Sequence, residues 1–271
     1  MVTPIGTEMF NGFRSKYPEF EVITPQRKQS FTVRTMTVNE EENLKGSLLT
    51  PLTVPEHLAQ VLWTCICKKP DYIKTYDDFI NNVTLRDRDA LIYGLYVATY
   101  KDIQNFTITC RECDKQTKVK VNMDKSASFD VWPDDKGDIM KYHEKIELEI
   151  TQGVDCYLKV PTMADEIEIS RQAMKMTEKM ASLATDSLMI EKFVIHGTAE
   201  NPTPDEIIKE KNNIVTGYTT LPAKDRKTID AKYRDVYDTK RMTVMTEFKC
   251  ECGNVQKVPI DITRQFFLAL Y

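Results

Sequence analysis

Alternation of apolar and polar positions predicts three hairpins along the chain. In residues 18–37, PEFEVIT and SFTVRTMT alternate on either side of the polar run PQRKQ, which is the pattern of two strands joined by a turn. Residues 105–123, NFTITCRECDKQTKVKVNM, alternate before and after a polar turn that carries two cysteines. Residues 244–262, VMTEFKCECGNVQKVPIDI, repeat this arrangement. We therefore expect two cysteine-tipped hairpins, one in the first half of the chain and one near its end.

Helical spacing predicts a helical body between the first two hairpins. The stretch VNEEENLKGS predicts a short helix that ends near Gly46. Thr53 with Glu56, and Thr84 with Asp87, have the spacing of a capping box, and each pair predicts the start of a longer helix. The body of the second of these helices, ALIYGLYVATYK, is apolar on almost every side. We expect it at the centre of a core.

The residues between the two cysteine hairpins predict a separate, mostly helical unit. KIELEI and CYLKVP predict paired strands around Gly153. Four helices are expected after them: one that follows Pro161, one over about 186–196 that stops at Gly197, one from a Thr203–Glu206 capping box to near Gly217, and one over about 224–238. The first of these helices carries an apolar stripe made of Ile169, Ala173, Met176 and Met180.

Composition narrows the class of protein. The 271 residues are 41% hydrophobic and 29% charged, which is typical of a globular chain and excludes a disordered chain or a coiled-coil rod. No uninterrupted apolar run approaches the ~18 residues of a transmembrane helix, and the first residues predict no secretory signal, so no membrane partner is expected. The formal net charge of −4 weakens the case for non-specific nucleic-acid binding, because that binding depends on neutralising phosphate.

Four of the seven cysteines form two close pairs, Cys110 with Cys113 and Cys250 with Cys252. C-x2-C places two thiolates on one turn, and Gly253 after the C-x-C pair allows a positive φ that turns backbone N–H groups toward sulfur. Four thiolates on two strand-flanked turns are a donor set for tetrahedral zinc, and they leave no position for water. The sequence thus predicts a structural Zn2+ site with these four ligands. Free thiols at two unrelated turns, or a disulfide across the pairs, are the alternatives.

Together these elements predict an α+β fold with three parts. Residues 1–125 form an N-terminal helix-and-hairpin part with the first knuckle, residues 126–240 a strand pair and a mostly helical insertion, and residues 241–271 the second knuckle hairpin and an apolar tail. The two cysteine-tipped zinc-knuckle hairpins would close the insertion as a loop. The tail, RQFFLALY, is expected either to dock on the body or to insert into a neighbour.

No catalytic residue or organic cofactor is predicted. The three histidines, His57, His143 and His196, make no HExxH motif, and the chain has neither GxSxG nor a glycine-rich nucleotide loop. Cys65 is expected in the core, and Cys156 is expected to pack in a strand. The Met-rich run AMKMTEKM predicts core packing, with an adaptable partner-binding surface as the alternative.

Four segments follow one another in a recognisable order: SFTVRTMTVNEEENLKGS, TLRDRDALIYGLYVATYKDI, FTITCRECDKQTKVKVNM and CYLKVPTMADEIEI. This arrangement, over most of residues 20–260, resembles the baseplate hub and hub-assembly proteins of T-even-type contractile-tailed bacteriophages. The resemblance implies a non-enzymatic structural or assembly component of the tail baseplate, with other hub and tail proteins as partners. It implies a place in the virion tail baseplate after assembly in the host cytoplasm. The family's metal knuckle would fall on Cys110, Cys113, Cys250 and Cys252, with C-x-C in the second pair where C-x2-C is commoner.

A zinc-ribbon protein that binds nucleic acid is the alternative from another class. Its contact surface would consist of basic residues around the first knuckle, Arg111, Lys115, Lys118 and Lys120. The same lysines are also typical of a solvated hairpin edge that is protected against aggregation. Salt-dependent DNA binding separates the two hypotheses. A hydrolase is a third class, and it requires a pocket of acidic residues that the sequence does not predict.

Overall fold

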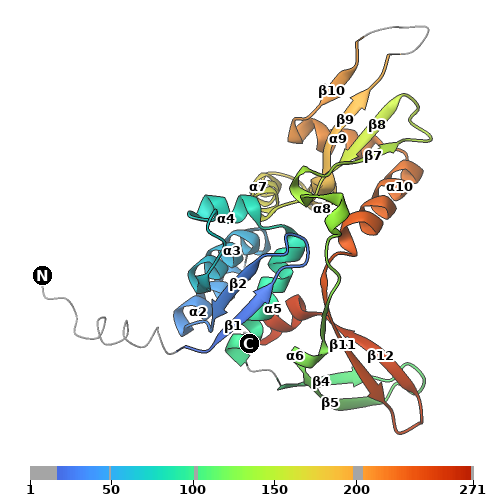
Figure 1. The fold of residues 1–271 in the computed structure, drawn as a ribbon. Helices are drawn as coiled ribbons and strands as arrows, with labels where there is room; N and C mark the ends of the chain where they lie inside the picture. The colour runs from blue at the N-terminus through green and yellow to red at the C-terminus, as the bar shows by residue number, and fades with distance from the viewer. Residues whose placement is uncertain (1–16, 49, 101–102, 198–203, 270–271) are drawn as a thin grey trace, which may run out of the picture.

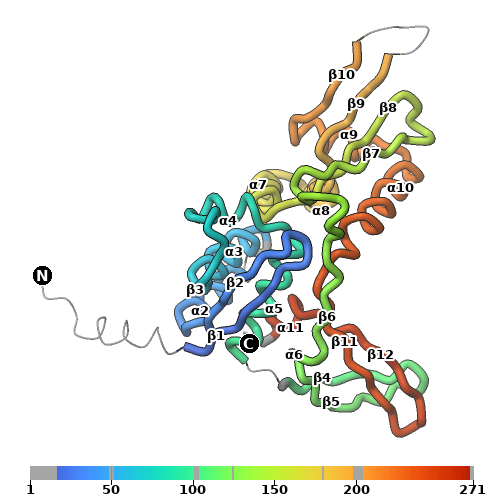
Figure 2. Tube along the Cα trace, viewed as in Figure 1, coloured from blue at the N-terminus to red at the C-terminus, as the bar shows by residue number. Residues whose placement is uncertain are grey.

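The computed structural model describes residues 17–48, 50–100, 103–197 and 204–269, and it has three bodies (Figure 1). A helical body with a small sheet lies at the centre, a second sheet with its own helices lies at one end, and two neighbouring hairpins lie at the other. Two connecting segments run side by side between the end bodies (Figure 2), where the Asp130 N–H donates to the Arg241 carbonyl oxygen at 3.1 Å. The mixture of helix and sheet agrees with the predicted α+β class.

The central body contains a three-stranded antiparallel sheet and four helices. The sheet has the order β1-β2-β3, made of β1 (Glu19–Ile23), β2 (Ser30–Arg34) and β3 (Ile66–Lys68). The helices are α2 (Val38–Ser47), α3 (Val54–Cys65), α4 (Tyr76–Asn82) and α5 (Leu85–Tyr100). The predicted first hairpin and the three predicted helices are confirmed, whereas the sequence analysis did not find β3 or α4.

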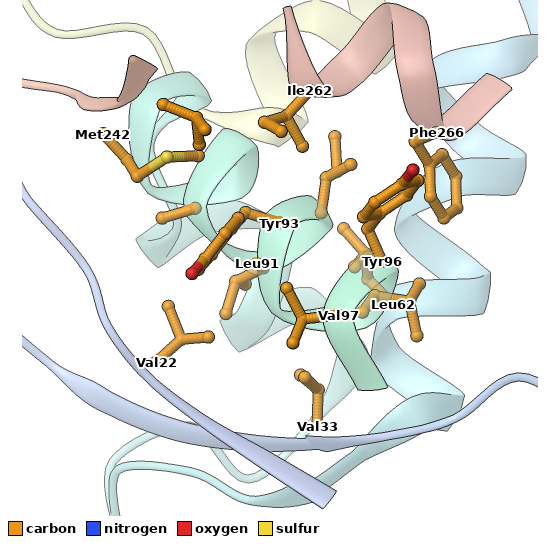
Figure 3. Packing of buried hydrophobic residues seen from close by; sticks show 14 of the residues in the cluster. Val22, Val33, Leu62, Leu91, Tyr93, Tyr96, Val97, Met242, Ile262 and Phe266 are labelled. Carbon is orange, nitrogen blue, oxygen red and sulfur yellow. The ribbon is translucent and has the colours of Figure 1, made fainter. Parts of the chain in front are cut away.

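Helix α5 runs through the centre of the larger hydrophobic core (Figure 3). Every residue from 90 to 98 is buried, so the helix has neighbours on all sides, as its sequence predicts. Gly94 makes this packing possible, because a Cβ there would collide with Cγ2 of Val22 on β1. Figure 3 shows Val22 on one side of α5 and Phe266, from the end of the chain, on another.

The two capping boxes predicted in the central body have different outcomes. Thr84 Oγ1 accepts the Asp87 N–H at 3.1 Å, as expected, but the Asp87 carboxylate has other partners. Thr53 makes no capping hydrogen bond, and its hydroxyl donates instead to a backbone carbonyl three residues earlier. Glu56 forms an ion pair with Arg171 of another helix. The Thr53–Glu56 box is therefore wrong, because a 3₁₀ turn directly before α3 sets the entry of the chain.

The body at one end holds a four-stranded antiparallel sheet of order β10-β9-β8-β7, in a second hydrophobic core. Its strands are β7 (Glu144–Glu147), β8 (Val154–Leu158), β9 (Ile190–Ile195) and β10 (Glu206–Ile208). Its helices are α8 (Glu178–Asp186), α9 (Lys211–Thr220) and α10 (Ala223–Tyr233), the last continued by a π-helical turn, Arg234–Asp238. Helix α7 (Met163–Ala173) lies between this body and the central body, and it buries Met163 and Ile167 in the larger core. The predicted strand pair around Gly153 and the helix over about 224–238 are confirmed.

Two of the segments that were predicted as helices in this insertion contain strands. The segment predicted as a helix over 186–196 forms β9, which pairs with β8. Its β-branched and aromatic residues suit a pleated surface, and pairing with an existing strand outweighs the helical spacing. Residues 206–208 then add β10 to the edge of β9, so the next helix begins only at Lys211. Thr203 of the predicted capping box lies outside the described residues.

The helix predicted after Pro161 is interrupted between α7 and α8. The apolar stripe predicted for one helix is divided at Thr177. Its Oγ1 accepts the Met180 N–H at 3.4 Å, so Thr177 is the N-cap of a new helix, α8. Met174 and Met180 are 48% and 36% exposed. Core packing is therefore wrong for these two methionines, which lie on the surface.

The two cysteine hairpins form the body at the other end, and both are confirmed. The first pairs β4 (Ile103–Thr109) with β5 (Gln116–Asn122), and the second pairs β11 (Met242–Lys249) with β12 (Val255–Ile260). A short helix and strand, α6 (Met123–Ser126) and β6 (Ala127–Phe129), lead back to β11.

The end of the chain docks on the central body. Helix α11 (Ile262–Ala269) packs against α5, and Phe266 is fully buried there. The apolar tail was expected either to dock on the body or to insert into a neighbour. As far as residue 269, it docks on the body. Among the described residues, none of the helices combines the length and the apolar character needed to cross a bilayer.

Candidate metal centre

The first knuckle is a closed turn at the tip of the β4–β5 hairpin. The Cys110 N–H donates to the Lys115 carbonyl oxygen at 3.0 Å, and the Asp114 N–H donates to the Cys110 carbonyl oxygen at 3.0 Å. Asp114 has a φ of 57°, a left-handed conformation that aspartate tolerates better than most residues. This turn brings Cys113 back beside Cys110.

The second knuckle closes in the same way with one residue fewer. The Cys250 N–H donates to the Asn254 carbonyl oxygen at 2.8 Å, and the Gly253 N–H donates to the Cys250 carbonyl oxygen at 2.9 Å. Gly253 has a φ of +91°, as its position after the C-x-C pair predicts. The shorter spacing of Cys250 and Cys252 therefore belongs to a shorter turn of similar construction.

The two knuckles bring the four sulfur atoms within 4.8 Å of one another. Cys110 Sγ lies 3.7 Å from Cys252 Sγ, and Cys113 Sγ lies 3.6 Å from Cys250 Sγ. All four cysteines are free thiols, so no disulfide joins them. Because their sulfur atoms lie close together, the two turns that carry them are not unrelated. Cys110 and Cys250 are buried, and Cys113 and Cys252 are exposed.

The dimensions of this cluster fit a tetrahedral thiolate-bound metal. Zinc–sulfur bonds of about 2.3 Å place neighbouring sulfurs of a tetrahedron about 3.8 Å apart, close to the 3.6 and 3.7 Å observed across the pairs. The Asn254 side-chain N–H, with backbone N–H groups of the first knuckle, lowers the pKa of Cys110, whereas, against a backbone hydrogen bond at Lys115, the neighbouring Cys252 and Cys250 sulfurs raise the pKa of Cys113. A thiolate is the form of cysteine that binds metal. The four cysteines can thus hold a metal ion.

Polar contacts between the knuckles surround the sulfur cluster. Asn254 and Gln256 reach from the second hairpin to the first, and Lys115 forms an exposed ion pair with Glu251. Sequence reasoning identified the four cysteines but missed Asn254 and Gln256. Their only signal was a two-residue spacing directly after the C-x-C-G turn, which places both on one face of a strand.

The remaining cysteines and the histidines lie away from this cluster. Cys65 is buried in the larger core and Cys156 packs in strand β8, as predicted for each, and Cys156 is also buried in the second core. His196 lies between two carboxylates, with Nε2 2.7 Å from Asp155 Oδ2 and Nδ1 3.0 Å from Asp205 Oδ1. His57 lies on α3 and His143 lies directly before β7. The fold brings none of these histidines to the sulfur atoms.

A buried carboxylate on α5 is a second polar centre that sequence reasoning missed. Asp87 is 1% exposed, and its Oδ1 accepts the Gln26 N–H at 2.7 Å while Oδ2 accepts the Arg27 N–H at 3.1 Å. Burial raises the pKa of Asp87 to about 7, against the effect of these hydrogen bonds. Capping and the helix dipole therefore do not account for this acid, which anchors the turn of the first hairpin.

The same hairpin turn also contacts the insertion. The Gln26 side-chain Nε2 donates to the Tyr237 carbonyl oxygen at 2.9 Å, and the Trp132 N–H donates to the Pro25 carbonyl oxygen at 2.9 Å. The turn is thus held between α5 and the two segments that connect the insertion to the hairpins. We refer to residues 24–28 with Asp87, Trp132 and Tyr237 as the Asp87 joint.

Comparison with protein families gives one match. The family model described as T4 bacteriophage base plate protein matches residues 17–268, which include the four cysteines, the Asp87 joint and the docked C-terminal helix. No curated protein and no solved structure matches the chain.

Proposed function

We propose, from the premise that this chain belongs to the T4 bacteriophage base plate protein family, that it is a non-enzymatic component of the central hub of the tail baseplate. The observation that carries the proposal is the extent of the family match, which runs through all three bodies of the molecule. A structural component of a phage tail is the role that this membership supports. The hub is the more specific place that the sequence resemblance implies.

In this proposal the four cysteines hold one structural zinc ion. Cys110, Cys113, Cys250 and Cys252 supply four sulfur ligands, so no position remains for a water or a substrate. Zinc bound in this way would fasten the C-terminal hairpin to the first hairpin. Its binding free energy becomes folding free energy, on the order of 10 kcal/mol. The support comes from the thiolate donor set and from sulfur distances that suit a tetrahedron.

The proposed zinc also defines how the chain is divided. Residues 1–125 and 241–271 would form one unit joined at the metal, and residues 126–240 would be an insertion between them. Support comes from the larger hydrophobic core, which contains side chains from both ends of the chain, although Met163 and Ile167 of the insertion also pack into it, and from the second core, which lies within the insertion.

Partners in this role are other baseplate hub and tail proteins, in the virion tail after assembly in the host cytoplasm. The exposed methionines Met174, at the end of α7, and Met180, in α8, suit such contacts, because methionine adapts its shape to a partner surface. Met174 and Met180 are the residues whose replacement by Gln would weaken a contact there without disturbing either core.

The experiment that tests the role uses the phage that encodes this chain, with a nonsense codon in the corresponding gene. We expect tail assembly to stop before a complete baseplate forms, as seen by electron microscopy of lysates, and a plasmid copy of the chain to restore it. Mass spectrometry of purified tails then separates a retained hub protein from an assembly factor that leaves. Complete, infectious tails assembled without the chain would contradict the proposal.

Nucleic-acid binding by a zinc ribbon is not favoured by the family match. Of the basic residues assigned to that surface, Lys115 is engaged in the ion pair with Glu251. Lys118 and Lys120 are exposed on β5, where lysine also protects a strand edge. A filter-binding titration with duplex DNA at low and high salt separates the two, since phosphate binding would weaken steeply with salt.

A further inference from the structure

The second knuckle places a side-chain amide on a sulfur atom of the first. Asn254 Nδ2 lies 3.4 Å from Cys110 Sγ and donates an N–H···S hydrogen bond. The backbone of Asn254 is itself fixed, because its carbonyl oxygen accepts the Cys250 N–H and closes the second turn. The donor to Cys110 is thus supplied by the same turn that supplies Cys250.

A second amide connects Asn254 to the backbone on both sides of Cys110. Gln256 Oε1 accepts from Asn254 Nδ2 at 3.3 Å and from the Arg111 N–H at 3.1 Å. Gln256 Nε2 donates to the Thr109 carbonyl oxygen at 3.1 Å. Gln256 therefore uses both ends of its amide, and it grips the residues immediately before and after the ligand.

We propose that Asn254 and Gln256 form a clasp between the hairpins that positions Cys110 for the metal and sets the affinity of the site. This inference rests on the proposed zinc site. Asn254 stabilises negative charge on the Cys110 sulfur through its N–H, as donors around metal ligands do. Gln256 orients the Asn254 amide and holds the first knuckle in register. Both are positioning residues, because they act on the metal through Cys110.

The strand that carries the clasp also provides a matched control. Asn254 and Gln256 are two residues apart, so they share the face that meets the first hairpin. Lys257 lies on the same strand but is exposed, and its cross-strand neighbour is Glu247 of its own hairpin. Lys257→Gln therefore changes the same strand without touching the clasp.

The test is a competition titration of the full-length chain against a chromophoric zinc chelator. We expect Asn254→Ala and Asn254→Asp to weaken zinc binding about 10-fold or more, with Asp the more severe because it replaces a donor by a negative charge. Gln256→Ala should cause a smaller loss, and Lys257→Gln should bind zinc as the wild-type chain does.

Cobalt substitution supplies a readout that general destabilisation would not move. Loss of the N–H···S bond raises the energy of the sulfur lone pairs, so the sulfur-to-cobalt charge-transfer band of Asn254→Ala should shift to longer wavelength. The band of Lys257→Gln should not shift. A wild-type chain that binds no metal would overturn both the zinc site and the clasp. A wild-type chain that binds zinc, with unchanged affinity and spectrum in the Asn254 variants, would overturn the clasp alone.

Discussion

The cysteine knuckles and the Asp87 joint both hold together segments that are distant in the sequence, and they do so with different chemistry. At the knuckles, cysteine side chains from distant parts of the sequence face one another. Cys110 and Cys252, for example, are 142 positions apart in the sequence. At the joint, one buried carboxylate receives the backbone N–H groups of a turn 61 positions away. The first junction would depend on the proposed zinc, whereas the second is made by hydrogen bonds within the chain. The comparison suggests that removing the metal should open one end of the molecule and leave the rest folded.

The largest effect is expected from breaking the knuckle junction, with Cys250→Ser. The proposed zinc contributes on the order of 10 kcal/mol, which is comparable with the stability of a whole domain, so the second hairpin should separate from the first. Hydrogen-exchange mass spectrometry should show rapid exchange in residues 242–260, as chelation of the wild-type chain should also do. Cys67→Ser, at an exposed sulfur outside the cluster, is the control. Equal protection in both variants would show that the metal does not hold this junction.

The next largest effect is expected from Asp87→Ala at the other junction. The substitution leaves the N–H groups of Gln26 and Arg27 without their acceptor in a buried place, and a buried donor left without an acceptor costs about 1–3 kcal/mol. We expect a loss of about 3 kcal/mol in the free energy of unfolding, measured in urea at neutral pH. Exposed Asp71→Ala serves as the control and should change stability little. Zinc binding by Asp87→Ala should be retained, since the two junctions are separate.

A smaller effect is expected from changing the pH, which should alter stability through Asp87 at the joint. The pKa of Asp87 is raised from 3.8 to about 7 in the folded chain, so between these values the folded state binds a proton that the unfolded state has lost. The part of the stability that comes from binding this proton is therefore fully present below about pH 4 and is lost as the pH rises through 7. Relative to Asp87→Asn, the wild-type chain should be more stable at pH 5 than at pH 8 by roughly 2–3 kcal/mol. A difference that does not vary with pH would contradict the assignment.

The smallest effect is expected from Lys115→Gln, which removes the exposed ion pair with Glu251 beside the knuckles. Exposed pairs contribute little because water and salt screen them. Zinc affinity in the competition assay should not change measurably. A large loss would mean that charge, and not sulfur with its clasp, holds the knuckles together.

The features that were predictable from the sequence are those that rest on side-chain identity and short periodicity. The cysteine spacing located both knuckles, period-two alternation located their strands, and the apolar run of α5 indicated a helix buried on all sides. Each of these signals lies within about twenty residues, and each arises from the same side chains that face the metal site or pack in the core.

The features that were missed depend on partners that are distant or that belong to the backbone. β9 has helical spacing taken alone, and only pairing with β8 makes it a strand. Asp87 has the position of a helix-capping acid, and nothing in the sequence shows that a distant turn offers it two backbone N–H groups. Asn254, at the end of the turn, and Gln256, in β12, have no distinguishing sequence signal until the first hairpin lies against them.

The most direct test of the account is the zinc content of the full-length chain, measured by native mass spectrometry after purification without chelator. The account predicts one zinc per wild-type chain and per Cys67→Ser chain, and none in Cys110→Ser or Cys250→Ser. A wild-type chain that is folded, with both hairpins protected from exchange and no metal bound, would contradict it.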